Sequence, residues 1–167
     1  DEAQYWRWSR TLDWGYYSKP PLIAWVIRAT PELFGNEVWA IRLPAPFLHT
    51  VAAAALFFLG RAVYGSRAGL YAALTYALMP GVILSSMLLS TDGVLLPVFA
   101  VALYLYWHAR QGVSGWIGHV ALGLAIGIAM LAKYAALYLL IGIGLTALID
   151  PPSRRAILSL KGAATFA

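Results

Sequence analysis

Five apolar stretches, each close to the length needed to cross a lipid bilayer, occupy the chain between residues 41 and 149. A transmembrane helix needs about 20 mainly apolar residues. Residues 41–63, 68–90, 93–109 and 116–132 meet or approach that length, and residues 134–149 fall slightly short of it. A single helix over 116–149 would far exceed a hydrocarbon core about 30 Å thick, so we expect a hairpin that turns near Lys133.

The composition agrees with a membrane protein. Hydrophobic residues make up 61% of the 167 residues and charged residues only 11%, whereas soluble domains carry about 25% charged residues. We therefore predict an all-α, polytopic transmembrane helix bundle within a lipid bilayer. The absence of cysteine excludes disulfides, thiolate metal sites and a thiol nucleophile. The net charge of +5 is spread over the loops between spans, so no nucleic-acid partner is expected.

The basic residues of the loops set the expected orientation. If the spans alternate in direction, six of these residues fall on one side of the membrane, and the positive-inside rule makes that side cytoplasmic. Asp92, Lys133 and the whole of residues 1–40 then fall on the outer side. The six residues are Arg61, Arg67, Arg110, Arg154, Arg155 and Lys161.

The first 40 residues contain no span, and we interpret them as a periplasmic loop in front of a transmembrane bundle over 41–167. Helical spacing places Tyr5, Trp8 and Leu12 on one face, and the apolar core of "KPPLIAWVIRATPELFG" is too short to cross. We expect two short juxtamembrane helices on the outer surface. The chain lacks an initial methionine and ends in "LKGAATFA", so we also expect a further span to start after 157 and the chain to be part of a longer membrane protein.

Acids and lysines are expected to converge on the outer face. Asp1 and Glu2 open the outer segment, Lys19 precedes its second helix, Asp92 ends the second span, and Lys133 sits at the tip of the last hairpin. Ionisable groups at such depth cost a few kcal/mol each unless they face a wet cavity or one another. Lysines bind phosphate, and a carboxylate can accept a proton from an attacking hydroxyl. The set therefore favours transfer of a group from a lipid-phosphate carrier.

Each of these residues also has a simpler interpretation, and the sequence leaves it open. Asp1 and Glu2 could be solvated acids at the headgroups. Asp92 could cap the following helix, because "STDG" before apolar residues is typical of a cap. Lys19 and Lys133 could extend their ammonium groups to the membrane surface without any ligand. No phosphate loop, dinucleotide motif or zinc motif is present in the chain.

Four ordered segments resemble the membrane glycosyltransferases of the GT-C superfamily, in the branch of protein O-mannosyltransferases and lipid A aminoarabinose transferases. They are "DEAQYWRWSRTLDWGYYSKPPLIAW", "VWAIRLPAPF", "LLSTDGVLLPVFAVALYLYW" and "LAKYAALYLL". The resemblance implies a sugar donor linked to polyprenyl phosphate. It also implies that Asp1, with Glu2 beside it, forms the catalytic pair and that Asp1 is the general base.

The same resemblance assigns substrate-binding residues. Lys19 in "SKPPL" and Lys133 in "LAKY" match positions that serve the carrier phosphate, and Asp92 matches an acid that lines the cavity. We add Tyr5, in the same motif as Asp1, to the substrate-binding candidates. The chain departs from the aminoarabinose branch at Gln4, where that branch has a basic residue, and at Ser18, where it has an acid that contributes to a metal site. We therefore predict no metal and no cofactor.

The leading hypothesis is a glycosyltransferase of the bacterial inner membrane. It would move a sugar from a polyprenyl-phosphate carrier to a lipid, glycan or protein acceptor on the periplasmic face. The main alternative is a transporter or flippase subunit that uses Asp92 and Lys133 in a polar pathway. A third interpretation is a structural subunit of a membrane assembly.

Overall fold

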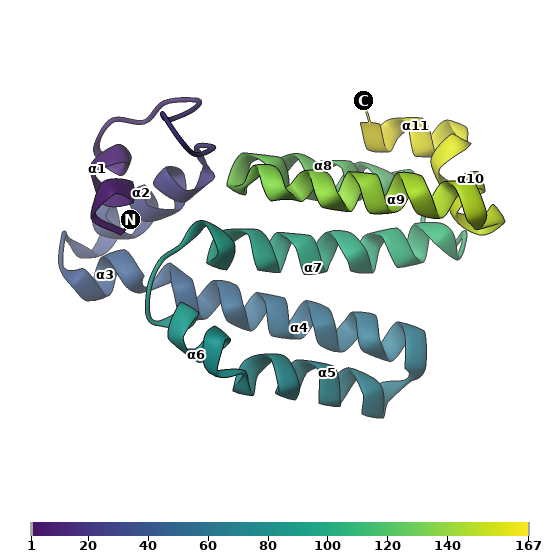
Figure 1. Cartoon of the computed structure of the whole chain (residues 1–167), viewed down its shortest axis with the longest axis horizontal. Coiled ribbons are helices and arrows are strands. Elements are labelled where there is room, and N and C mark those ends of the chain that lie inside the picture. The colour runs from purple at the N-terminus through teal and green to yellow at the C-terminus, as the bar shows by residue number, and fades with distance from the viewer. Residues whose placement is uncertain (1, 167) are drawn as a thin grey trace.

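The computed structural model describes residues 2–166, and every regular element among them is a helix (Figure 1). The prediction of an all-α membrane bundle is confirmed. The elements, in chain order, are α1 (Glu2–Arg10), α2 (Leu22–Phe34), α3 (Val38–Arg42), α4 (Pro44–Tyr64), α5 (Ser66–Leu78), α6 (Pro80–Ser86), α7 (Thr91–Arg110), α8 (Trp116–Ala132), the 3-10 helix η1 (Tyr134–Ala136), α9 (Leu137–Ile149), α10 (Pro151–Leu158) and α11 (Leu160–Phe166).

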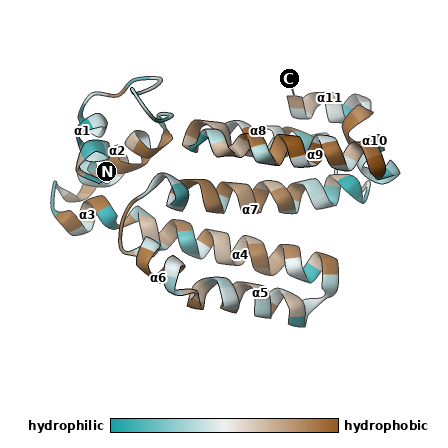
Figure 2. Ribbon diagram, in the orientation of Figure 1, coloured by the Kyte–Doolittle hydropathy of each residue, from teal (hydrophilic) through white to brown (hydrophobic). Residues whose placement is uncertain are grey.

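The long helices pack side by side in a row in which α4 and α5 are antiparallel, α4 and α7 are parallel, and α7 and α8 are antiparallel (Figure 1). α5 packs on α4, α4 on α7, and α7 on α8. The helices α4, α7 and α9 run away from α1–α3, whereas α5 and α8 return towards them (Figure 1). Apolar residues cover most of α4, α7, α8 and α9, and hydrophilic residues gather in α1 and near the helix ends (Figure 2). This distribution suits helices that lie in lipid with their ends at the two membrane surfaces.

The helices differ in their capacity to cross a membrane. Two continuous helical stretches, Val38–Tyr64 and Thr91–Arg110, are each long and apolar enough for a span. Two bent pairs, α5 with α6 and α9 with α10, reach the required length only together, and they bend by 63° and 117° at their breaks. The apolar helix α8 is shorter, with 17 residues.

The expected continuous span over 68–90 is broken. α5 ends at Leu78, Met79 adopts an extended backbone with φ −63° and ψ 127°, and α6 begins at Pro80. Proline disfavours a helical conformation for the residue before it and has no N–H for the preceding turn, which explains the break. The helix stops again at Ser86, so residues 87–90 form a non-helical link to α7.

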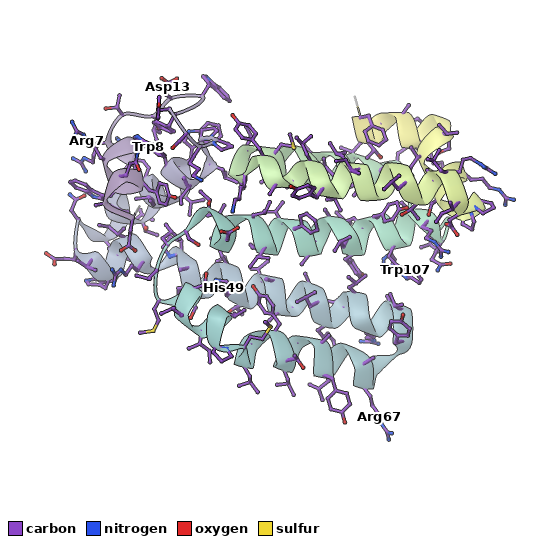
Figure 3. The ribbon with its side chains drawn as sticks, viewed as in Figure 1. Arg7, Trp8, Asp13, His49, Arg67 and Trp107 are labelled. Carbon is purple, nitrogen blue, oxygen red and sulfur yellow. The ribbon has the colours of Figure 1, made fainter. Side chains whose placement is uncertain are left out.

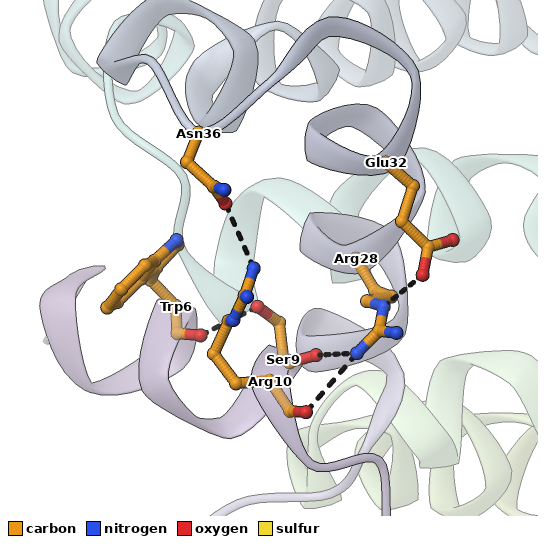
Figure 4. Close-up of polar contacts among 6 residues, drawn as sticks. All are labelled: Trp6, Ser9, Arg10, Arg28, Glu32 and Asn36. Atoms are coloured by element: carbon orange, nitrogen blue, oxygen red, sulfur yellow. Dashed lines mark hydrogen bonds and ion pairs between the residues drawn. The ribbon is translucent and has the colours of Figure 1, made fainter.

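The N-terminal helices are held together by polar contacts at the end of α1 (Figure 4). Arg28 of α2 donates to the backbone oxygens of Ser9 and Arg10, at 3.1 and 3.2 Å, and also pairs with Glu32. A cation that satisfies the last carbonyls of a helix also complements its dipole. α1 ends at Arg10, so Leu12, which we expected on the face of Tyr5 and Trp8, lies outside the helix and is exposed.

The two ends of the bundle carry different charges. We call the end that carries α1–α3, Asp92 and Lys133 the acid–lysine end. The opposite end, with Arg61, Arg67 and Arg110 at the ends of α4, α5 and α7, is called the arginine end. In Figure 3 the labelled Arg7 and Arg67 mark these two ends. At the arginine end the chain beyond α9 turns back, and α11 packs against α8. The predicted start of a further span, after residue 157, lies at the end of α10 and in α11.

Close backbone contact holds α4 against α5. A Cβ atom placed on Gly69 would lie 2.4 Å from the backbone oxygen of Phe57 and 2.9 Å from the backbone nitrogen of Arg61. Gly65, with φ +94°, makes the turn between the two helices in a conformation that other residues rarely adopt. Small residues allow membrane helices to approach in this way, and van der Waals contact then stabilises the pair.

We expect Gly69→Ala to destabilise the protein by about 1–3 kcal/mol, because the added methyl group meets backbone atoms that cannot move independently of α4. The measurement is thermal or denaturant unfolding of the full-length protein in detergent. Gly142→Ala is the matched control, since an added Cβ there has no neighbour within 4 Å. Equal loss of stability in the two variants would contradict this account of the α4–α5 contact.

Candidate active site

Segments that are far apart in the sequence pack together at the acid–lysine end. One buried apolar cluster joins α1, α2, the start of α4, the link before α7, the start of α7, the end of α8 and η1. Burial of this much apolar surface fixes the relative positions of the polar groups around it. The cluster consists of Tyr5, Ile23, Ile27, Ala45, Leu89, Val94, Leu95, Ala129, Ala132 and Ala136.

Glu2 is bound by two distant parts of the chain. Arg42 donates from Nε to Oε1 and Oε2 at 3.0 and 3.1 Å, and from Nη2 to Oε2 at 2.6 Å. The backbone N–H of Leu89 donates to Oε1 at 3.1 Å. Burial by itself raises the pKa of the Glu2 carboxyl, but the hydrogen bonds from Arg42 and Leu89 outweigh burial and lower the pKa below its usual range. The carboxylate is therefore ionised, and it ties α1 to α3 and to the link before α7.

Asp92 and Lys133 form an ion pair, with Lys133 Nζ donating to Asp92 Oδ1 at 2.6 Å. Asp92 is the second residue of α7, and Lys133 lies between α8 and η1 in an extended conformation. The side chain of Asp92 is 60% exposed and that of Lys133 is 31% exposed, so the pair is open to solvent. The cap of α7 is Ser90, whose Oγ accepts from the Gly93 N–H at 3.1 Å. The capping role considered for Asp92 thus belongs to Ser90.

Tyr5 belongs to the buried apolar cluster of this end. Its side chain is only 3% exposed. Burial raises the pKa of the Tyr5 phenol, a hydrogen bond with Thr91 lowers it, and the negative charge of Asp92 raises it, with a net increase above the usual value. The phenol of α1 is therefore close to the first turn of α7. This position gives Tyr5 a packing contact with the Asp92 region rather than a surface open to a substrate.

The two remaining predicted site residues are Lys19 and Asp1. Lys19 lies in the loop between α1 and α2, where its backbone oxygen accepts from the Tyr16 N–H at 3.1 Å. Within residues 2–166 its ammonium group makes no hydrogen bond or ion pair, and its side chain is partly exposed. Asp1 lies outside the described residues, next to Glu2 in the chain.

A cavity of about 330 Å³ lies beside the Glu2–Arg42 pair. Its lining includes Glu2, Trp6, Ile41 and Arg42. The indole N–H of Trp6 is buried and has no hydrogen-bond partner among the described residues. An apolar cavity with a few convergent polar groups is typical of a ligand site. Asp92 and Lys133 are at the same end of the bundle but are not among the residues that line this cavity.

Two polar groups of this region were missed in the sequence. Arg42 stands in the quoted "VWAIRLPAPF", but no local pattern there indicates its pairing with residue 2. His49 is buried in α4, where Nδ1 is 2.7 Å from the Tyr76 hydroxyl and Nε2 is 3.1 Å from the Ser85 Oγ. It joins α4 to α5 and α6 through these hydrogen bonds.

Residues 2–166 contain no candidate metal site. No three His, Cys, Asp or Glu side chains in that part of the chain are close enough to bind one ion. Among the described residues, the polar groups at the acid–lysine end include carboxylates, an ammonium group, a guanidinium group and an indole N–H.

Comparison with known proteins supplies the family. The model for dolichyl-phosphate-mannose-protein mannosyltransferases matches residues 18–166. The chain is 45% identical, over 158 residues, to the lipid A galacturonosyltransferase RgtD of Rhizobium johnstonii, covering 94% of this chain and 33% of that protein. It is 29% identical, over 157 residues, to the undecaprenyl phosphate-alpha-4-amino-4-deoxy-L-arabinose arabinosyl transferase 2 of Sodalis glossinidius, covering 80% of this chain and 27% of that protein.

The chain thus spans about a third or less of the curated relatives it matches. No solved structure matches it. The resemblance to GT-C membrane glycosyltransferases is confirmed by these matches, and with the membrane-length helices they make this a multi-pass membrane protein. The chain belongs to the dolichyl-phosphate-mannose-protein mannosyltransferase family.

Proposed function

We propose that the chain forms the catalytic end of a glycosyltransferase that moves a sugar from a polyprenyl-phosphate carrier to lipid A. The observation that carries the proposal is the meeting of Glu2, Asp92 and Lys133 at one end of a membrane bundle, away from the arginine end. The 45% identity to a lipid A galacturonosyltransferase favours lipid A as the acceptor class, and the weaker relative is named for a donor linked to undecaprenyl phosphate.

The acid–lysine end faces the periplasm of the bacterial inner membrane in this proposal. The arginines at the other end support that orientation, because basic residues of short loops stay in the cytoplasm. An outer-face reaction also suits a lipid-linked donor, since the lipid carries the activated sugar across the bilayer and no nucleotide is needed there. The described residues offer Lys133 as a point charge for the carrier phosphate.

Asp1 is the general base of the proposed reaction. It accepts the proton of the attacking hydroxyl, whose oxygen then bonds to the anomeric carbon of the sugar. The bond between that carbon and the carrier phosphate breaks with inversion, and its electron pair leaves on the phosphate. Glu2, which we first grouped with Asp1 as catalytic, is already bound by Arg42 and by the Leu89 amide. Its contacts favour a positioning role for Glu2, in which it fixes the start of α1 to α3 and to the link before α7.

Lys133 stabilises the negative charge on the departing phosphate, and Lys19 supplies a second ammonium group. Asp92 holds Lys133 in place when no donor is bound, and the phosphate replaces it in the complex. An exposed ion pair contributes only about 0–1 kcal/mol, so its exchange for a phosphate contact costs little. The pair therefore keeps the ammonium oriented without blocking donor binding.

We expect Asp1→Asn in the full-length protein to reduce sugar transfer by roughly 100-fold to 10,000-fold, because the amide cannot accept the proton. The measurement is transfer of radiolabelled sugar from a polyprenyl-phosphate donor to lipid A in membranes. Asp13→Asn is the matched control, since Asp13 is an exposed acid of the same N-terminal segment and Asn keeps an oxygen for the Trp14 N–H. Wild-type turnover by Asp1→Asn would remove Asp1 from the mechanism.

Substitutions in the ion pair should act in opposite directions on the donor. Lys133→Gln loses a charge-assisted contact with phosphate, so we expect kcat/KM for the donor to fall roughly 10-fold to 100-fold. Asp92→Asn frees Lys133, so KM for the donor should fall by about twofold to fivefold. Initial rates against donor concentration give both values, with Arg67→Gln at the arginine end as the control. A raised donor KM in Asp92→Asn would instead mean that Asp92 contacts the substrate.

A further inference from the structure

A second cavity, of about 630 Å³, lies at the arginine end, between the end of α7, the start of α8 and the α10–α11 turn. Its size falls in the range of about 300–1,000 Å³ that is usual for small-molecule sites. It is separate from the proposed catalytic end by the length of the bundle (Figure 1). The polar residues of its lining include Arg110, Ser114, His119, Arg155, Ser159 and Lys161.

The positive charge of this cavity exceeds the negative charge near it. Arg110 is paired with Asp150, at 3.0 Å from Nε to Oδ2 and 2.9 Å from Nη2 to Oδ1. The guanidinium of Arg110 and the hydrogen bonds from Ser153 lower the pKa of Asp150 to about 2, so this carboxylate is ionised and already engaged. Arg155 and Lys161 form no ion pair within residues 2–166. The lining thus carries three cations, and the one carboxylate paired with any of them, Asp150, binds Arg110.

A buried and unpartnered side chain points to a ligand. His119 is 4% exposed, lines the cavity, and its Nε2 has no hydrogen-bond partner among the described residues. Its Nδ1 lies 3.2 Å from the Gly115 backbone oxygen. A carbonyl oxygen only accepts, so Nδ1 carries a proton and donates it. In the neutral ring Nε2 is then an acceptor, which suits a hydroxyl donor on a ligand. A buried acceptor without a partner is costly, and a ligand hydroxyl would remove that cost.

The start of α8 also favours a negatively charged ligand. Its N-cap is Gly115, and no side chain caps the first turn. The uncapped amide groups and the helix dipole together favour an anion at the N-terminus of a helix. Ser114 precedes this cap and also lines the cavity. Cations and the buried His119 therefore line one cavity beside the start of α8.

We propose that this cavity binds a phosphate group that carries a neighbouring hydroxyl. Arg155 and Lys161 pair with the phosphate oxygens, and His119 Nε2 accepts the hydrogen bond of the hydroxyl. The phosphoglycerol headgroup of an anionic lipid has this chemistry, and so does free hydrogen phosphate. The site is independent of sugar transfer, and its ligand is neither donor nor acceptor of the proposed reaction.

The test uses the full-length protein in nanodiscs and separates the two sources of phosphate. In one arm, native mass spectrometry measures the retention of phosphatidylglycerol. In the other arm, inorganic phosphate is added to protein in phosphatidylcholine nanodiscs, and thermal protection is measured. We expect Arg155→Gln with Lys161→Gln to weaken retention or protection by roughly 10-fold to 100-fold, because two charge-assisted contacts are lost.

The matched control is Arg67→Gln with Arg154→Gln, which removes the same charge from the same end at residues outside the lining. We expect less than a twofold effect from this pair. His119→Leu should weaken binding of the hydroxyl-bearing ligand without a change of net charge, and its melting temperature without ligand reports its folding. Equal weakening in both double variants would reduce the site to the general field of the arginine end and overturn the proposal, as would absence of binding in both arms.

Discussion

The Glu2 carboxylate is the polar contact on which the acid–lysine end depends, because it joins three segments, α1, α3 and the link before α7, beside the buried apolar cluster. Its partners are Arg42, at the end of α3, and the amide of Leu89, in the link before α7. The Leu89 amide belongs to a non-helical segment, where its donor needs a partner outside a helix. One carboxylate thus satisfies a guanidinium group and an otherwise orphaned backbone donor. Hydrogen bonds to charged groups contribute about 1.5–3 kcal/mol each.

That contact exists only because the second span is broken. A continuous helix over 68–90 would have satisfied the Leu89 amide internally and carried the chain directly into α7. The break at Met79–Pro80 and the end of α6 at Ser86 leave a short link that can reach α1. His49 links the two sides of the bend, because its ring nitrogens form hydrogen bonds with Tyr76 of α5 and with Ser85 of α6. Membrane helices tolerate such breaks where neighbouring side chains supply new partners.

Part of this arrangement follows from the sequence. Alternation of the spans predicts that Asp92 and Lys133 share one end, because two crossings separate them. In the structure Lys133 Nζ lies 2.6 Å from Asp92 Oδ1. Pro80 gave a local signal for the break, but the apolar run on both sides of it favoured a continuous span. The partnership of Glu2 with Arg42 had no such signal. It joins residues 40 positions apart, and many exposed arginines at helix ends have no partner.

The exposure of the site's charges bears on how it could work. Asp92 is about twice as exposed as Lys133, so water can solvate the carboxylate when it leaves, whereas the ammonium stays close to the protein. In the donor of the proposed reaction the carrier phosphate is a diester with one negative charge, like a carboxylate, and it gains a second negative charge when the sugar leaves. In that proposal, the contact of Lys133 with the phosphate therefore strengthens as the bond to the sugar breaks. The side chain of Glu2 is only 25% exposed, and its carboxylate is bound by three donors. Its release from Arg42 would leave a partly buried charge without its partner, which costs more free energy than the release of Asp92 from Lys133. The two ion pairs of the acid–lysine end thus suit different tasks, one as a fixed joint and the other as a replaceable contact.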